Sequence, residues 1–216
     1  MNIKCILVII TLGVGMATKA QEQALEISGI VKDENNVPIN AEIILKDKKN
    51  NNIIKTISNH LNGEYNIKIS SQKNNNYYVV FLKENYFFKV EEIKYSELQK
   101  KGYKIKKEVV LQKLKEGGKY IIGGKNNFYG NSTNNKESAH ISMEALHELM
   151  SKNQIKIEIW AYEPYDEYHY NIETSSRIAK NITHYLIKNG IGRERIKDID
   201  YLGAQKYKVE IKIITY

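Results

Sequence analysis

Acidic, basic and polar side chains gather between residues 163 and 177 of this 216-residue chain. They include Glu163, Asp166, Asn171, Ser175 and Arg177. Carboxylates and a guanidinium can bind groups of opposite charge, and bidentate Arg–carboxylate pairs fix orientation as well as charge. We therefore take these five residues as candidate ligand-binding residues.

Other chemistry is conceivable for the same segment. Glu167 and His169 join the carboxylates and could suggest a metal site or an acid/base pair, although polar loops often have this composition without either. His140 and His147 lack metal-ligand spacing and are interpreted as solvated. We expect no catalytic residue, no metal and no cofactor, so the chain is not predicted to be an enzyme.

Regular elements must hold these side chains in place. Ile155, Ile157 and Ile159 alternate with polar or amphipathic residues, as in a half-buried strand. A helix is predicted from Thr174-Ser175, which are good capping residues, to Gly190, which is free to take the left-handed cap. A second helix is predicted over 142–152, after a loop, and a last strand over 209–213.

The pattern from Ile155 to Tyr216 resembles the OmpA-like domain, which anchors bacterial envelope proteins to peptidoglycan. The positions that match the family's helix pattern are Asn171, Ser175, Ala179, Ile182 and Leu186. The resemblance implies an α/β domain of the βαβαβ type with a mixed sheet. It also implies contact with the diaminopimelate of peptidoglycan.

The two grip residues of that family are replaced here. Pro164 stands at the position of the family's Asp, and Ile178 stands at that of its Arg. Glu163 and Arg177 each lie one place early. One residue along a helix is a rotation of ~100°, so Arg177 is predicted to point away from the place of Ile178, which should pack in the core. We therefore expect weak or altered peptidoglycan contact, or none.

The N-terminus has the features of an export signal. Lys4 precedes a short apolar run, and Ala20 offers a small residue for cleavage, so residues 1–20 are interpreted as a secretory signal peptide. The only cysteine, Cys5, begins the apolar run and so lies before the cleavage point, which argues against a lipid anchor and leaves the mature chain without disulfides. A periplasmic location is expected, either free or in association with the outer membrane. The net charge of +8 fits anionic envelope polymers but fixes no partner.

Short strands separated by turn residues fill the segment 21–113. Asn62-Gly63 is a tight-turn dipeptide, for which a positive φ is expected at the glycine. Gly29, Val31, Pro38 and Tyr65, among others, resemble the carboxypeptidase regulatory-like domain, which implies a non-catalytic β-sandwich.

Five aromatic residues of this segment could form a sugar platform, but strand aromatics more often pack in a core. They are Tyr77, Tyr78, Tyr86, Phe87 and Phe88. Two glycine pairs within 114–126 are interpreted as a linker.

The sequence therefore predicts two domains after the signal peptide: an all-β sandwich over 21–113, and an α/β, OmpA-like domain over 127–216. The expected function is that of a non-catalytic anchoring or scaffold module of a Gram-negative cell envelope, in contact with peptidoglycan or envelope proteins. The alternative is a protein-interaction adaptor of an outer-membrane or secretion assembly. Neither nucleic acid nor a membrane-spanning segment of the mature chain is expected.

Overall fold

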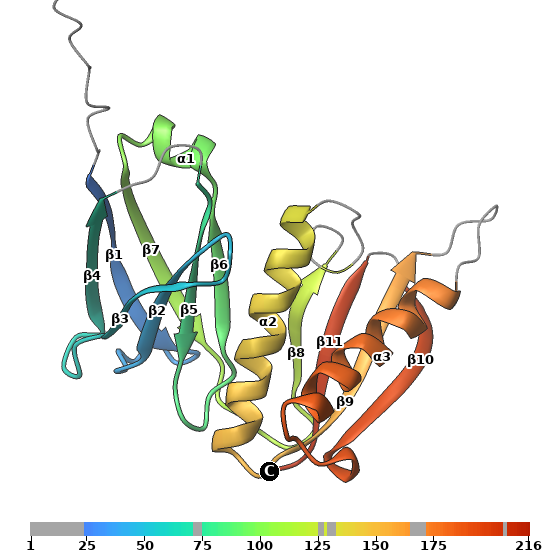
Figure 1. Ribbon diagram of the computed structural model, residues 1–216. Helices are drawn as coiled ribbons and strands as arrows, with labels where there is room; N and C mark the ends of the chain where they lie inside the picture. Colours follow the sequence, from blue (N-terminus) through green and yellow to red (C-terminus); the bar gives the residue numbers. More distant parts are fainter. Residues whose placement is uncertain (1–23, 71–74, 125–127, 129–132, 165–171, 205–206) are drawn as a thin grey trace, which may run out of the picture.

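The computed structural model describes residues 24–70, 75–124, 128, 133–164, 172–204 and 207–216. These residues form three sheets and two long helices, with strand as the main element (Figure 1). The predicted signal peptide lies outside the described residues. No helix within the described part is both long enough and apolar enough to cross a membrane.

The first unit consists of two sheets packed face to face. One has the order β4-β1-β7, with β1 antiparallel to β4 and parallel to β7, and the other, β3-β2-β5-β6, is antiparallel throughout. The strands are β1 (Ala24–Asp33), β2 (Glu42–Asp47), β3 (Asn52–Ile57), β4 (Glu64–Ser70), β5 (Tyr77–Leu82), β6 (Lys89–Ile93) and β7 (Lys104–Leu111). Leu25, Ile27, Ile43, Val79 and Phe81 are among the buried residues between the two sheets.

Two local features of this unit differ from the prediction. The short helix α1 (Tyr95–Lys100) was not expected from the sequence. Residues 86–88 also lie outside the short strands expected to fill this segment, and β6 begins only at Lys89, because Tyr86 bridges to Lys113 and the amide of Phe87 donates to the carbonyl of Gln112.

The second unit is a mixed four-stranded sheet of order β10-β9-β11-β8, with α2 and α3 on one face (Figure 1). Its elements are β8 (Lys119–Gly124), α2 (Thr133–Lys152), β9 (Lys156–Pro164), α3 (Ile172–Lys188), the 3-10 helix η1 (Arg193–Arg195), β10 (Ile196–Ala204) and β11 (Lys208–Thr215). β9 runs parallel to β10 and antiparallel to β11, which is antiparallel to β8. The expected mixed sheet is present.

The chain order in this unit is β-α-β-α-β-β, so the expected βαβαβ order lacked one strand, β10. The first strand is β8, which lies inside the segment 114–126 predicted as a linker. Tyr120 and Ile122 are buried and alternate with exposed residues, whereas the glycine pairs on either side had indicated a joint.

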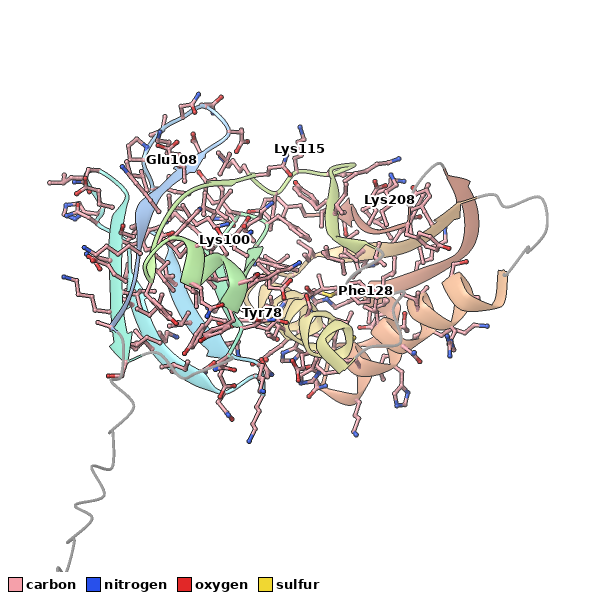
Figure 2. All side chains as sticks on the ribbon, turned by 90° about the horizontal axis from the view of Figure 1, so that it is seen from above. Tyr78, Lys100, Glu108, Lys115, Phe128 and Lys208 are labelled. Atoms are coloured by element: carbon pink, nitrogen blue, oxygen red, sulfur yellow. The ribbon has the colours of Figure 1, made fainter. Side chains whose placement is uncertain are left out.

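Helix α2 begins at Thr133, not at Ser142 as predicted, so most of the expected loop before it is helical. The helix lies between the two units, and its side chains are buried on both sides. Figure 2 shows Tyr78 of β5 on one side of α2 and Phe128 on the other. Ala145, Leu146, Leu149 and Met150 therefore share one apolar cluster with residues of both units.

The shared cluster explains the sequence of β5. All six of its residues, Tyr77–Leu82, are buried. Alternate residues of β5 face the first core and α2, so the strand is covered on both faces. A strand that is buried on both faces typically has a continuous apolar sequence. The two units are thus joined by packing as well as by the chain.

Candidate functional site

The predicted ligand-binding residues lie around the start of α3, which crosses from β9 to β10. Helix α3 packs on both strands through Ile178, Ala179, Ile182 and Leu186, all of which are buried. Gly190, with a φ of 97°, ends it as expected. The helix is therefore fixed in rotation about its axis.

That rotation decides which side chains could reach a ligand. Ser175 is fully buried, Ile178 is 5% exposed, and Arg177 lies on the exposed side. The prediction that Ile178 packs in the core is confirmed. Arg177 and Ser175 therefore lie on different faces, and α3 does not bring them together at one ligand.

The structure says less about the other candidates. Glu163 lies in β9 opposite Gly203, and Pro164 lies opposite Ala204, at the end of the β9–β10 ladder. Asp166 and Asn171 lie outside the described residues, as do Glu167 and His169.

The two histidines of α2 make ordinary contacts. The ring of His140 lies edge-on to Tyr185, with centroids 5.4 Å apart, and Nε2 of His147 lies 2.9 Å from the carbonyl oxygen of Asn189. Within the described ranges, no group of three or more His, Cys, Asp or Glu side chains could hold a metal.

The aromatic residues of the first unit do not form a sugar platform. Tyr77, Tyr78, Phe87 and Phe88 are each at most 6% exposed, and Tyr86 is half-buried against the first core. The core interpretation is confirmed, because these rings fill the space between the sheets and beneath α2.

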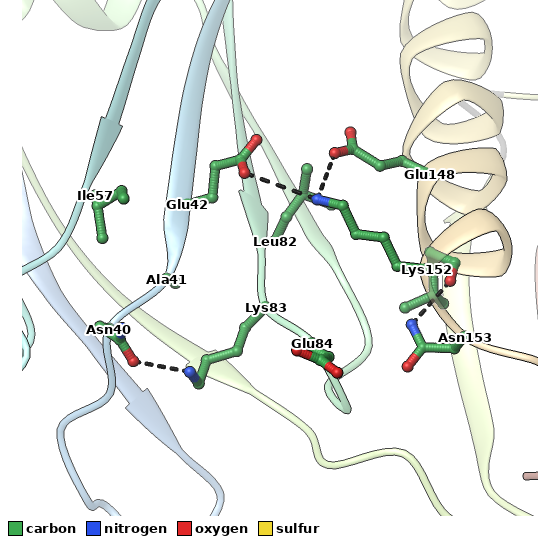
Figure 3. Close-up of a pocket in the computed structure, with 11 residues that line it drawn as sticks. Asn40, Ala41, Glu42, Ile57, Leu82, Lys83, Glu84, Glu148, Lys152 and Asn153 are labelled. Carbon is green, nitrogen blue, oxygen red and sulfur yellow. Dashed lines mark hydrogen bonds and ion pairs between the residues drawn. The ribbon is translucent and has the colours of Figure 1, made fainter.

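A pocket of about 450 Å³ lies where the two units meet (Figure 3). We call it the junction pocket. Its walls come from β2, β3, the turn after β5 and the last two turns of α2. The lining residues are Asn40, Ala41, Glu42, Ile57, Leu82, Lys83, Glu84, Glu148, Leu149, Lys152 and Asn153.

Charges of both signs line the junction pocket. Nζ of Lys152 lies 2.7 Å from Oε1 of Glu148 and 3.7 Å from Oε2 of Glu42, so this ammonium bridges α2 and β2. The other oxygen of Glu42 pairs with Lys55 at 2.7 Å. The hydrogen bond to Glu148 raises the pKa of Lys152, which therefore stays an ammonium at neutral pH.

The opposite wall of the pocket carries a second cation and acid. Nζ of Lys83 donates to Oδ1 of Asn40 at 2.8 Å, and Glu84 follows it in the turn (Figure 3). The exposed side chain of Ile57 and the buried Leu82 add apolar surface. This arrangement suits a small ligand that carries both an ammonium and a carboxylate on a short apolar frame.

Sequence reasoning missed the junction pocket. Its residues come from segments about a hundred positions apart, and their types are those of ordinary surface positions. The only signal in the sequence is that the apolar residues of α2 extend beyond a single stripe of the helix. A second apolar surface on a helix requires a second packing partner.

A second charged surface covers the face of the second sheet that lies opposite its helices. Glu158 pairs with Lys197 and Lys212, and Glu210 pairs with Lys119 and Lys208. The ammonium of Lys208 lies 4.1 Å from the centre of the Tyr162 ring, and that of Lys119 lies 4.8 Å from the Trp160 ring. Each lysine has an acidic partner, but four lysines face only two glutamates, so this face keeps an excess of positive charge beside the Trp160 and Tyr162 rings.

No protein-family model matches this chain, and no curated protein matches its sequence.

Proposed function

We propose that this chain is an exported, non-catalytic scaffold of a Gram-negative cell envelope, which contacts cell-wall peptide through the junction pocket. The proposal keeps the resemblance of the two segments to a carboxypeptidase regulatory-like sandwich and an OmpA-like domain. It moves the ligand contact from the start of α3 to the meeting point of the two units.

The observation that best supports this proposal is the charge pattern of the junction pocket. The stem peptide of peptidoglycan offers ammonium and carboxylate groups close together. Glu84 matches the first and Lys83 the second, beside the bridge that Lys152 makes between Glu42 and Glu148. Because both units contribute walls, a bound peptide would also brace one unit against the other.

The state of Lys152 favours binding over catalysis. A lysine that serves as a nucleophile or base needs a lowered pKa, so that a neutral amine is available. Two carboxylates act on this ammonium in the opposite direction.

Cosedimentation with purified sacculi tests the proposal. The mature chain is expected to bind, and Lys83→Gln combined with Glu84→Gln should weaken binding several-fold without changing the net charge. The matched control is Glu97→Gln combined with Lys101→Gln, an exposed pair of α1 whose charged atoms lie 3.0 Å apart. Equal binding by the two double variants would disprove a role for the junction pocket.

The adaptor function is the second candidate, and the position of Ile178 favours it. A buried isoleucine at the family's arginine position leaves α3 without the guanidinium that would grip diaminopimelate. An absence of sacculus binding, together with cross-links to envelope proteins in cells, would decide for the adaptor.

A further inference from the structure

Two strand edges face each other beneath α2. β6 is the last strand of one sheet and β8 the last strand of another, and neither has a second partner among the described strands. In Figure 1 they lie on either side of α2. Two cavities of about 370 and 360 Å³ lie between them, and both are lined by Phe88, Lys89 and Ile121. We call this space the edge slot.

The edge slot has an aromatic boundary and an apolar opening. The ring of Phe87 stacks on that of Tyr120, with centroids 4.3 Å apart and planes within 6°. Val110 and Ile121 beside it are 47% and 66% exposed, which is unusual for large apolar side chains on adjoining elements. This part of the surface is therefore suited to contact with another apolar side chain.

Polar groups in the edge slot lack partners. The free side of an edge strand presents a row of unpaired N–H and C=O groups, and here two such rows line one space. Ser142 of α2, which lines the inner cavity, is fully buried, and its Oγ has no hydrogen-bond partner in the described structure. A buried hydroxyl without a partner is unfavourable, so Ser142 is a weak point in the wall of the inner cavity.

The charge around the outer cavity selects the kind of segment that would fit. Lys89 and Lys119 line that cavity with half-exposed ammonium groups, and no acidic residue lines it. Their acidic partners, Glu91 and Glu210, lie 3.9 and 3.8 Å away, so each ammonium still has donors for an incoming carboxylate. The one acid of the inner cavity, Glu92, already accepts a hydrogen bond from Asn76 at 3.3 Å. An incoming chain should therefore carry Asp or Glu beside its apolar residues.

We propose that the edge slot receives an extended segment of a partner protein, with alternating apolar and acidic residues, as an added strand between β6 and β8. Main-chain hydrogen bonds to the two edges would supply affinity, and alternate side chains would meet α2 on one face and the lysines on the other. The proposal does not depend on sacculus binding, because the edge slot and the junction pocket share no lining residue.

The proposal is tested by selecting binders to the mature chain from a displayed library of linear peptides. The peptides are about ten residues long, which is the length of a long strand. Enriched peptides should combine acidic with alternating apolar residues, and a synthetic copy should slow amide exchange in 89–93 and 119–124. Ile121→Glu should weaken its binding about tenfold or more, because the new carboxylate would repel the acidic peptide, whereas Ile121→Lys should weaken it less.

Ile53→Glu is the matched control, because Ile53 is also exposed, at 38%, and lies on β3, the far edge of the sheet that contains β6. It should leave binding unchanged. Failure to enrich any peptide, exchange protection confined to other strands, or equal effects of Ile121→Glu and Ile53→Glu would each overturn the proposal. Slow amide hydrogen exchange along both edges in the absence of peptide would overturn it as well, because the edge amides would then already have partners.

Discussion

Gly63 sits in a turn where two separate constraints exclude a side chain. Its φ is 68°, as the Asn-Gly pair predicts, and a Cβ built there would lie 2.3 Å from the carbonyl oxygen of Val31. That carbonyl cannot move freely, because the amide of the same residue donates to the carbonyl of Gly63 at 2.9 Å.

We expect Gly63→Ala to lower the free energy of unfolding by about 3 kcal/mol, from backbone strain of ~1–2 kcal/mol plus steric overlap of similar size. Gly102→Ala is the control, since Gly102 has a φ of 58° but no atom within 4 Å of its Cβ position. It should cost only the strain. Urea denaturation measures both, and equal losses would show that the overlap relaxes at no cost.

Glu158 links stability to pH. Burial opposes its charge, but hydrogen bonds from Lys212, Lys197 and Trp160 outweigh burial and hold the pKa of Glu158 below its usual 4.5. A lowered pKa stabilises the folded state above the unfolded value, and this contribution disappears as the pH falls through the folded value. Glu158→Gln should therefore cost about 0.5–1.5 kcal/mol at pH 7, reduced by the exposure of the lysines.

The stability difference between Glu158→Gln and the natural chain should shrink as the pH falls below 4.5. Urea denaturation across that pH range measures the difference. Glu97→Gln, in an exposed pair, serves as the control, with a smaller effect at every pH. A difference that is independent of pH would mean that packing, not charge, explains the loss.

For single residues, the local sequence predicts some structural features and not others. The burial of Ile178 and the conformation of Gly63 follow from local periodicity and turn chemistry, and both were predictable. The junction pocket was not, because Glu42 and Glu148 meet only through the packing of α2 on β2. No local pattern encodes such a meeting.

Among the elements, α2 has an unusual C-terminal cap. Arg195 of η1 donates from Nε to the carbonyl of Ile155 at 3.0 Å, and from one terminal nitrogen to the carbonyls of Met150 and Asn153, each at 2.7 Å. The guanidinium thus satisfies carbonyls that a helix end leaves unpaired, and its charge favours the negative end of the helix dipole.

Arg195→Met should therefore destabilise the protein by about 2–4 kcal/mol, for three hydrogen bonds to a charged group that is partly exposed. Arg195→Lys should recover only part of this, since an ammonium cannot reproduce the planar fork. Thermal unfolding followed by circular dichroism measures the change. Arg193→Met, which removes the 3.1 Å hydrogen bond from Arg193 to the carbonyl of Ile196, is the control, and an equal loss there would contradict the capping role.

The elements that the sequence predicted less well are those whose patterns are mixed. β10 has two aspartates and a glycine among its apolar residues, which is typical of a loop, and the parallel ladder to β9 overrides that preference. Helix α2 was predicted too short because its first turns are rich in Asn, Thr and Ser. Long periodic segments such as α3 and β5 were predictable because one face or both faces are apolar.

For the whole molecule, the shared core predicts that both units unfold together. Val79 and Val80 of β5 are each at most 2% exposed, and they face the first core and α2 respectively. Val79→Ala and Val80→Ala should each cost about 1–3 kcal/mol and should lower the same single transition.

Scanning calorimetry measures whether the two units unfold in one transition. Equal calorimetric and van't Hoff enthalpies would indicate one cooperative unit. Two resolved transitions, of which Val79→Ala shifts only one and Val80→Ala only the other, would show that the units unfold independently.

The double role of β5 also limits how this chain can evolve. Modules that are joined by a plain linker can be exchanged by recombination, since each keeps its own interior. Here a sandwich transferred without α2 would expose Tyr78, Val80 and Leu82 to water, and a second unit transferred alone would lose the surface on which α2 rests. The two halves must therefore be inherited as a pair, and substitutions on either side of β5 are expected to coevolve across both cores.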